Sequence, residues 1–169
     1  ATATASGDIT NTGALAITGA TTFTAAGGQS ITVANASNNF ASTVAFNSGG
    51  TLSSVSVHDT TAFDLAALSV SGTLTVSSGA AISQSGALTV GGTSSFTSTG
   101  TNTNITLSNA SNALTGAVTL TTAGTSGDVS IDNNTTALGI QGTINGGLTV
   151  VNGAAITDSG TLTVSGTSS

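Results

Sequence analysis

The chain of 169 residues has no lysine, arginine, glutamate, proline, cysteine, methionine, tryptophan or tyrosine. Without a basic side chain it has nothing to neutralise phosphate groups, so we exclude nucleic-acid binding as a main function. The same absence removes P-loop lysines, arginine fingers and Schiff-base lysines. The absence of cysteine removes disulfides, thiol nucleophiles and thiolate metal sites.

Two further scarcities narrow the possible functions. The one histidine, His58, cannot build a multi-histidine metal centre. No apolar run approaches ~20 residues, so we expect no membrane-spanning helix. Six aspartates with no opposing charge give a formal charge of −6, which anionic membranes should repel weakly. We therefore expect no catalytic residues, no bound cofactor and no metal site.

What the chain does contain is mostly small and polar. Thr, Ser, Ala, Gly and Asn make up 121 of the 169 residues. Such low complexity is compatible with disorder, but disordered chains combine low hydrophobicity with high net charge. Here 37% of the residues are hydrophobic and only 4% are charged. The Val, Leu, Ile and Phe residues also follow a regular pattern, which favours an ordered fold.

The chain contains a repeat of about 74 residues. Residues 74–95 and 148–169 match at 16 of 22 positions without a gap, at an offset of 74. A weaker match joins 9–28 to 82–101 at an offset of 73, and one extra residue near Asn104 restores 74. We therefore divide the chain into a first copy at 1–73, a second at 74–147 and the start of a third at 148–169. Because both ends stop inside a repeat and no methionine begins the chain, we expect an internal fragment of a longer polypeptide.

Within each copy the commonest motif is an apolar residue, a small residue and a second apolar residue, as in Leu74-Thr75-Val76. This alternation predicts short strands with one face turned inward. The Gly, Asn, Ser and Asp clusters between the motifs predict tight turns. No segment keeps a helical period of 3.6, so we expect almost no helix.

Short strands of this kind also occur in sandwiches and barrels, but the close sequence repeat favours a solenoid. We predict an all-β parallel β-helix, or β-solenoid, with about 18–25 residues in each coil and three or four coils in each repeat. Coils about 4.8 Å apart would form a continuous rod of about 40 Å. Since no polar caps close its ends, we expect the chain to stack end to end or aggregate.

Three segments carry a resemblance to a known group of proteins, namely ISQSGALTV at 82–90, GTSSFTSTGTN at 92–102 and ITLSNASNALTGAVTL at 105–120. They resemble the β-strand repeats of very large bacterial secreted surface proteins, such as filamentous-haemagglutinin-like proteins and autotransporter-type adhesins. The resemblance covers essentially the whole chain. It implies a right-handed β-helical fibre outside the cell, in which the repeats act as spacer and scaffold.

Two groups of residues could suggest catalysis. His58 and Asp59 are the only neighbouring base and carboxylate, and we interpret them as part of a solvent-exposed turn. Asp128 and Asp132 are close enough in sequence to share a turn, and a glycosidase needs two carboxylates about 5–9.5 Å apart. We interpret the aspartates as turn caps, with weak calcium binding or catalysis as alternatives.

The other polar and aromatic signals are interpreted as structural. Asn35 and Asn38 match Asn109 and Asn112 one repeat later, which predicts positive φ angles and stacked amides between coils. The phenylalanines alternate with leucine at matched positions and are predicted in the core. Thr-x-Thr rows such as Thr22-Phe23-Thr24 bind ice in some solenoids, but here they do not recur once per coil along the sequence.

These observations lead to one main functional hypothesis and two alternatives. We expect a non-catalytic structural shaft of a bacterial extracellular fibre or surface adhesin, which associates with itself end to end or laterally. The first alternative is a binding module whose flat Thr/Ser/Asn face contacts cell-surface glycan or ice. The second is a β-helix enzyme acting on polysaccharide.

Overall fold

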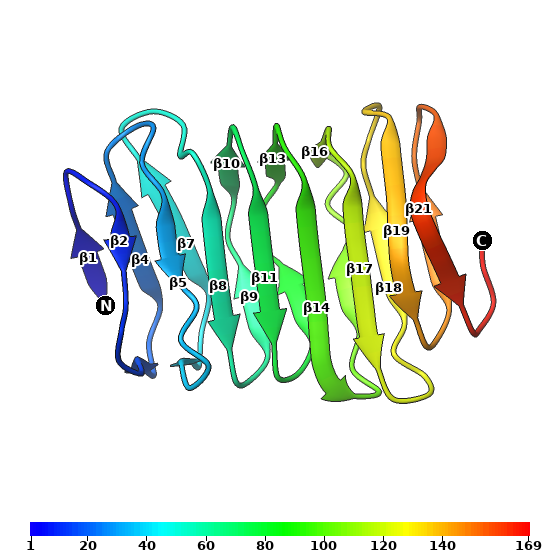
Figure 1. The fold of residues 1–169 in the computed structure, drawn as a ribbon, viewed down its shortest axis with the longest axis horizontal. Helices are drawn as coiled ribbons and strands as arrows, with labels where there is room; N and C mark the ends of the chain where they lie inside the picture. Colours follow the sequence, from blue (N-terminus) through cyan, green and yellow to red (C-terminus); the bar gives the residue numbers. More distant parts are fainter.

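The computed structural model describes residues 1–169 and shows a parallel β-solenoid without helices. The chain winds through about 8 turns of about 20 residues, with the N-terminus at one end of the rod and the C-terminus at the other (Figure 1). This confirms the predicted solenoid, its coil length and the expected lack of helix.

Two parallel sheets of eight strands each form the broad faces of the rod. We call them sheet A and sheet B. Sheet A consists, in spatial order, of β1 (Thr2–Thr4), β4 (Thr21–Ala25), β7 (Val44–Ser48), β9 (Phe63–Leu65), β12 (Ile82–Gln84), β15 (Ile105–Leu107), β18 (Val129–Asp132) and β20 (Leu148–Val151). Sheet B consists of β2 (Ile9–Thr10), β5 (Ile31–Val33), β8 (Val55–Asp59), β11 (Leu74–Ser78), β14 (Ser94–Thr101), β17 (Val118–Ala123), β19 (Leu138–Ile144) and β21 (Ile156–Val164).

Two short sheets lie at opposite edges between the broad faces. The first contains β3 (Ala16–Ile17) and β6 (Asn39–Phe40), and each of these strands leads from sheet B to sheet A. The second contains β10 (Leu68–Val70), β13 (Leu88–Val90) and β16 (Ala113–Leu114), and each of these leads from sheet A to sheet B. The second sheet therefore occupies the other edge, along the top of Figure 1.

The alternation of side chains explains why these segments form strands on a narrow core. In β11, Leu74 and Val76 are fully buried, while Thr75 between them is exposed. The same pattern recurs in most strands of both broad sheets, so the apolar–small–apolar motif places its two apolar residues inside. Each strand pairs in parallel with strands about one turn earlier and later, which satisfies its backbone groups on both sides.

The core is one continuous cluster of 31 buried hydrophobic residues along the rod. All five phenylalanines belong to it, which confirms the prediction from the Phe–Leu exchanges. Phe23 and Phe46 stack with ring centroids 5.8 Å apart, and Phe40 meets Phe23 edge-on at 6.0 Å. Each buried side chain of this size stabilises the fold by about 1.5–3 kcal/mol relative to exposure.

Buried amides fasten neighbouring turns where the strands end. The side-chain oxygen of Asn38 accepts the backbone N–H of Leu15 at 2.9 Å, and its amide donates to the carbonyl of Val33 at 2.8 Å. Asn112 makes the equivalent pair of bonds, accepting from Leu88 N–H at 2.9 Å and donating to the Leu107 carbonyl at 3.0 Å. These asparagines are fully buried, so the bonds replace lost contacts with water.

The conformation predicted for the matched asparagines is wrong, although amides of neighbouring turns do meet. The only non-glycine residues with positive φ are Asn102 and Asn134. Asn35 and Asn109 instead accept the N–H two residues later at 3.0 Å, as in Asx turns. The amide contacts between turns join Asn11 to Asn38, and Gln84 to Asn112.

The number of coils in each repeat lies between the three and the four that were predicted. Residues 1–73 contribute seven strands to the broad sheets, and residues 74–147 contribute seven more. Since one full turn uses a strand of each broad sheet, one repeat makes three and a half turns rather than three or four. Bulges shift the register between some paired strands. One such shift occurs between β19 and β21 at Gly142, where φ is +126°.

Candidate functional site

His58 and Asp59 lie in strand β8 and point to opposite sides of sheet B, so their placement in an exposed turn is wrong. Asp59 is fully buried, with its Oδ1 accepting N–H bonds from Phe40 at 3.2 Å and Thr61 at 3.1 Å. His58 faces outward, and its Nδ1 lies 3.2 Å from Oγ of Ser77 on the next turn. The two side chains therefore do not form a base–carboxylate pair.

Asp128 and Asp132 are not brought together in a turn either. Asp128 immediately precedes β18 and Asp132 ends it, so their Cα atoms are about 13 Å apart along an extended segment. Asp128 accepts the Gly147 N–H at 2.7 Å, and Asp132 accepts the Asn134 N–H at 2.8 Å. The two carboxylates share no hydrogen-bond partner.

The remaining aspartates also bond to nearby backbone or hydroxyl groups. Asp8 accepts the Ser30 N–H from the next turn at 2.7 Å, and Asp158 accepts the Gly160 N–H at 2.9 Å. Asp64 accepts hydroxyl bonds from Thr43 at 2.6 Å and Ser83 at 3.2 Å, one turn to each side. The turn-cap interpretation therefore holds for Asp132 and for Asp59, which each end a strand and accept the N–H two residues later. Asp158 makes its bond within β21, and Asp8, Asp64 and Asp128 join neighbouring turns.

No three of the His and Asp side chains gather into a group that could hold a metal ion. The structure has no helix long and apolar enough to cross a membrane.

Outward side chains, most of them hydroxyl-bearing, form two columns on the outer surface of sheet B. Only one turn of these columns has the form Thr-x-Thr, at Thr119-Leu120-Thr121, which agrees with the expectation that this motif does not recur once per coil. The register of β8, β11, β14, β17 and β19 aligns their outward side chains turn by turn. The first column contains Ser56, Thr75, Ser95, Thr119 and Gln141, and the second contains His58, Ser77, Thr97, Thr121 and Thr143. We call this surface the hydroxyl face.

The members of the hydroxyl face also bond along its columns. Gln141 Nε2 donates to Thr119 Oγ1 at 2.9 Å, and His58 Nδ1 lies 3.2 Å from Ser77 Oγ. These two bonds join neighbouring turns through Gln141 and His58, the two members of the columns that carry no hydroxyl group.

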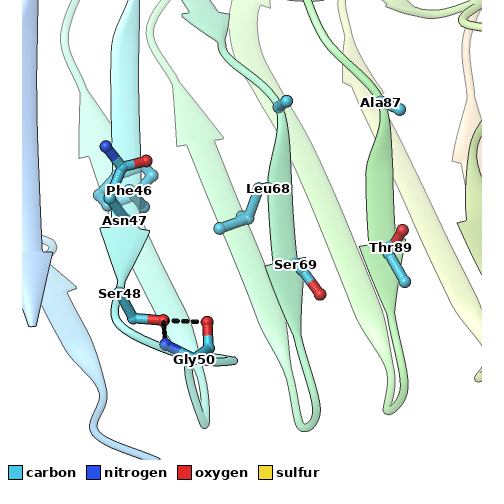
Figure 2. A pocket seen from close by; sticks show the side chains of 9 residues that line it. Phe46, Asn47, Ser48, Gly50, Leu68, Ser69, Ala87 and Thr89 are labelled. Atoms are coloured by element: carbon cyan, nitrogen blue, oxygen red, sulfur yellow. Dashed lines mark hydrogen bonds between the residues drawn. The ribbon is translucent and has the colours of Figure 1, made fainter. Parts of the chain in front are cut away.

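A groove of about 500 Å³ opens at the edge where the second short sheet begins. Figure 2 shows its side chains on three strands, β7, β10 and β13. Nearly buried Phe46 and Leu68 give it an apolar floor. Polar groups surround that floor, among them Asn47, Ser69 and Thr89. Ser48 donates to the carbonyl of Gly50 and accepts its N–H, which shapes the adjoining loop.

The groove arises from the arrangement of turns at this edge. Strand β10 is the first strand of its short sheet, and the preceding turn meets that sheet only through the single bridge between Leu52 and Val70. The edge is therefore less filled beside β7 than farther along the rod. Convergent polar groups over an apolar floor are typical of small-molecule sites in general.

The sequence suggested a flat Thr/Ser/Asn face but not the residues that compose it, and it did not reveal the groove. Neighbours in a column are one turn apart, and in sheet B that separation varies from 18 to 24 residues. Comparison of residues 74 apart therefore pairs positions that never touch. Spacing the apolar–small–apolar motifs by one turn and reading their middle residues together would have revealed the columns.

The chain matches a family described as repeats of unknown function, DUF5649, at residues 1–47, 52–121 and 126–169. No curated protein and no solved structure matches the chain. The match extends over nearly the whole chain. The chain belongs to the DUF5649 family of repeats.

Proposed function

We propose that this chain is a structural shaft, a rigid spacer segment of a bacterial extracellular fibre or surface adhesin. The observation that carries the proposal is the unbroken core of 31 hydrophobic residues between two eight-stranded parallel sheets. Such a rod resists bending because every turn is bonded to the next through backbone ladders. Its length grows by adding repeats, without a new fold.

Two features of the sequence support a location outside the cell. The repeats resemble those of large secreted bacterial surface proteins, as described above. The chain also lacks lysine and arginine, so trypsin-like proteases find no cleavage site in it. A surface fibre benefits from such resistance, because it meets proteases without the protection of a cell envelope.

Self-association is part of the proposal. At the first turn Ile9, Leu15 and Ile17 are only partly buried, and at the last turn Ile156 is 52% exposed. Within these 169 residues the outermost strands of each broad sheet have one unpaired edge, which can accept a strand from another copy or from a further repeat of a longer chain. End-to-end contact between copies would cover both the apolar side chains and the unpaired backbone groups.

Electron microscopy combined with fibre diffraction tests the shaft proposal. We expect straight rods of constant width and an axial repeat of about 4.8 Å, the distance between bonded strands. Flexible or globular particles without that reflection would exclude a rigid shaft.

A second candidate function is glycan binding, and the groove beside β10 is the observation that favours it. Its apolar floor and surrounding amide and hydroxyl groups suit a sugar ring, which has apolar faces and polar edges. The hydroxyl face is the corresponding candidate for ice, because it holds hydroxyl groups in two regular columns.

Binding measurements separate these candidates. In a glycan array, any sugar that binds at the groove should lose affinity when Asn47→Ala and Ser69→Ala are combined. The same sugar should be unaffected by Thr121→Ala on the hydroxyl face, which serves as the control. An ice-shaping assay tests the hydroxyl face, with Thr97→Val and Thr121→Val as the disrupting pair. Negative results in both assays would leave the shaft without a ligand of either kind.

A further inference from the structure

Residues that match across one repeat lie on opposite broad faces of the rod. Thr32 is in β5 of sheet B, and its equivalent, Thr106, is in β15 of sheet A. Thr75 is in β11 of sheet B, and Thr149 is in β20 of sheet A. All four threonines are exposed at the centre of matched motifs.

The short sheets follow the same rule. Strands β3 and β6 of the first copy match β13 and β16 of the second copy in sequence, yet they lie at the opposite edge. They lead from sheet B to sheet A, whereas their equivalents lead from sheet A to sheet B. The whole cross-section of the second copy is therefore turned by half a turn relative to the first.

Bonds between turns are preserved through this rotation. Ser54 Oγ accepts the Thr73 N–H at 3.1 Å beside sheet B, and Asp128 Oδ1 accepts the Gly147 N–H at 2.7 Å beside sheet A. The buried asparagines Asn38 and Asn112 likewise make matching bonds at opposite edges. The half-turn rotation therefore applies to the buried residues of a repeat as well as to its exposed residues.

The cause is the odd number of half-turns in a repeat. Seven strands of the broad sheets occur in 1–73 and seven in 74–147, and successive strands alternate between the two faces. Because the number of half-turns in one copy is odd, each strand of the next copy lies on the face opposite to its equivalent. At about 4.8 Å per turn, three and a half turns advance the pattern by about 17 Å along the rod.

We infer that a rod built from these repeats has two-fold screw symmetry, with each repeat presenting its surface on the side opposite to the previous one. The sequence of exposed side chains on sheet A therefore returns on sheet B about 17 Å farther along. The rod is two-sided: a second rod or a ligand that recognises one repeat finds the equivalent surface on both faces. This inference goes beyond the proposed shaft and depends only on the winding of the chain.

Spin-label distances test the alternation within the chain itself. The protein has no cysteine, so Thr32→Cys with Thr106→Cys can be labelled without background. We expect pulsed EPR to give about 25–35 Å, because the labels are separated by the two sheets as well as by about 17 Å along the axis. The matched control is Thr32→Cys with Thr75→Cys, two turns apart on one face, for which we expect about 10–20 Å.

A lengthened chain tests the symmetry of a longer rod. Residues 74–147 are duplicated after Gly147, and Thr32→Cys is combined with Thr106→Cys in either the first or the second duplicate. Biotin on the cysteines and streptavidin mark the sides of the rod in electron micrographs. We expect labels one repeat apart on opposite sides and labels two repeats apart on the same side.

Labels one repeat apart on the same side, or a short EPR distance for the first pair, would overturn the inference. The shaft proposal is judged separately, by whether rods with an axial spacing of about 4.8 Å form.

Discussion

Asp59 and Asn133 occupy the same place in two copies of the repeat, 74 residues apart, and both are fully buried. Asn133 uses both ends of its amide: Oδ1 accepts the Leu114 N–H at 2.8 Å, and Nδ2 donates to the Leu114 carbonyl at 3.1 Å. Asp59 reproduces the first bond, from Phe40 N–H at 3.2 Å, but its Oδ2 has no hydrogen-bond partner. The Oδ2 atom of Asp59 therefore occupies the position at which Asn133 places a hydrogen-bond donor, its Nδ2.

Placing asparagine at position 59 and aspartate at position 133 should change the free energy of unfolding in opposite directions. Asp59→Asn supplies the missing donor, and we expect it to raise the free energy of unfolding by about 1–3 kcal/mol. Asn133→Asp removes a donor from a buried site and should lower the free energy of unfolding by a similar amount. Urea denaturation followed by circular dichroism measures both. Equal effects of the same sign would contradict the role assigned to the amide.

At the scale of elements, glycines allow successive turns to approach closely. Gly72, Gly92 and Gly116 stack at one edge of the rod, each one turn from the next. A Cβ on Gly92 would stand 2.6 Å from the carbonyl oxygen of Gly72, which no relaxed structure tolerates. On the opposite edge, Gly146 and Gly166 repeat this arrangement, in keeping with the half-turn relation between copies.

Gly92→Ala should therefore lower the free energy of unfolding by about 1–3 kcal/mol, because the backbone of two turns must separate to admit the methyl group. Gly13 is the matched control, since nothing lies within 4 Å of the position its Cβ would take. We expect Gly13→Ala to change stability by less than about 0.5 kcal/mol. A thermal or urea melt of each variant gives the comparison.

The absence of proline has a structural reason that one substitution can test. Thr97 points outward from β14, which is bonded to β11 on one side and to β17 on the other. Thr97→Pro removes an N–H from the middle of a sheet, and we expect a loss of at least about 2 kcal/mol. Thr97→Val keeps the N–H and a β-branched shape, so it should leave the urea midpoint nearly unchanged.

The strands were predictable from sequence because their signal is local. The two apolar residues that flank Thr75 need only lie on the same face of the chain, and any strand places them there. The local sequence does not determine to which sheet a strand belongs, because this depends on how many half-turns precede the strand. The same reasoning explains why Asp59 was misplaced: a charged residue after a strand usually marks a turn, and its burial follows only from the next turn lying over it.

At the scale of the whole molecule, two exposed hydrophobic residues distinguish the two ways in which rods can associate. Ile156 aligns with the inward-facing Leu138, and it is 52% exposed in β21, the outermost strand of sheet B in these 169 residues. Val151 aligns with the outward-facing Asp132 and is 56% exposed on the broad surface of sheet A. The two residues therefore have similar exposure and both lie in outermost strands, but Ile156 is aligned with the core and Val151 faces outward from the side of the rod.

If the open end drives association, Ile156→Asp should shift the chain from oligomers to monomers, because a charge at the end opposes stacking of apolar turns. Val151→Asp should then leave the distribution unchanged. Sedimentation velocity at several protein concentrations measures both variants against the unmodified chain. The reverse result, with Val151→Asp alone producing monomers, would show that rods associate through their broad faces. In that case the two-sided surface produced by the half-turn repeat would allow each rod to bind a neighbour on either face, and sheets rather than single filaments would be the expected assembly.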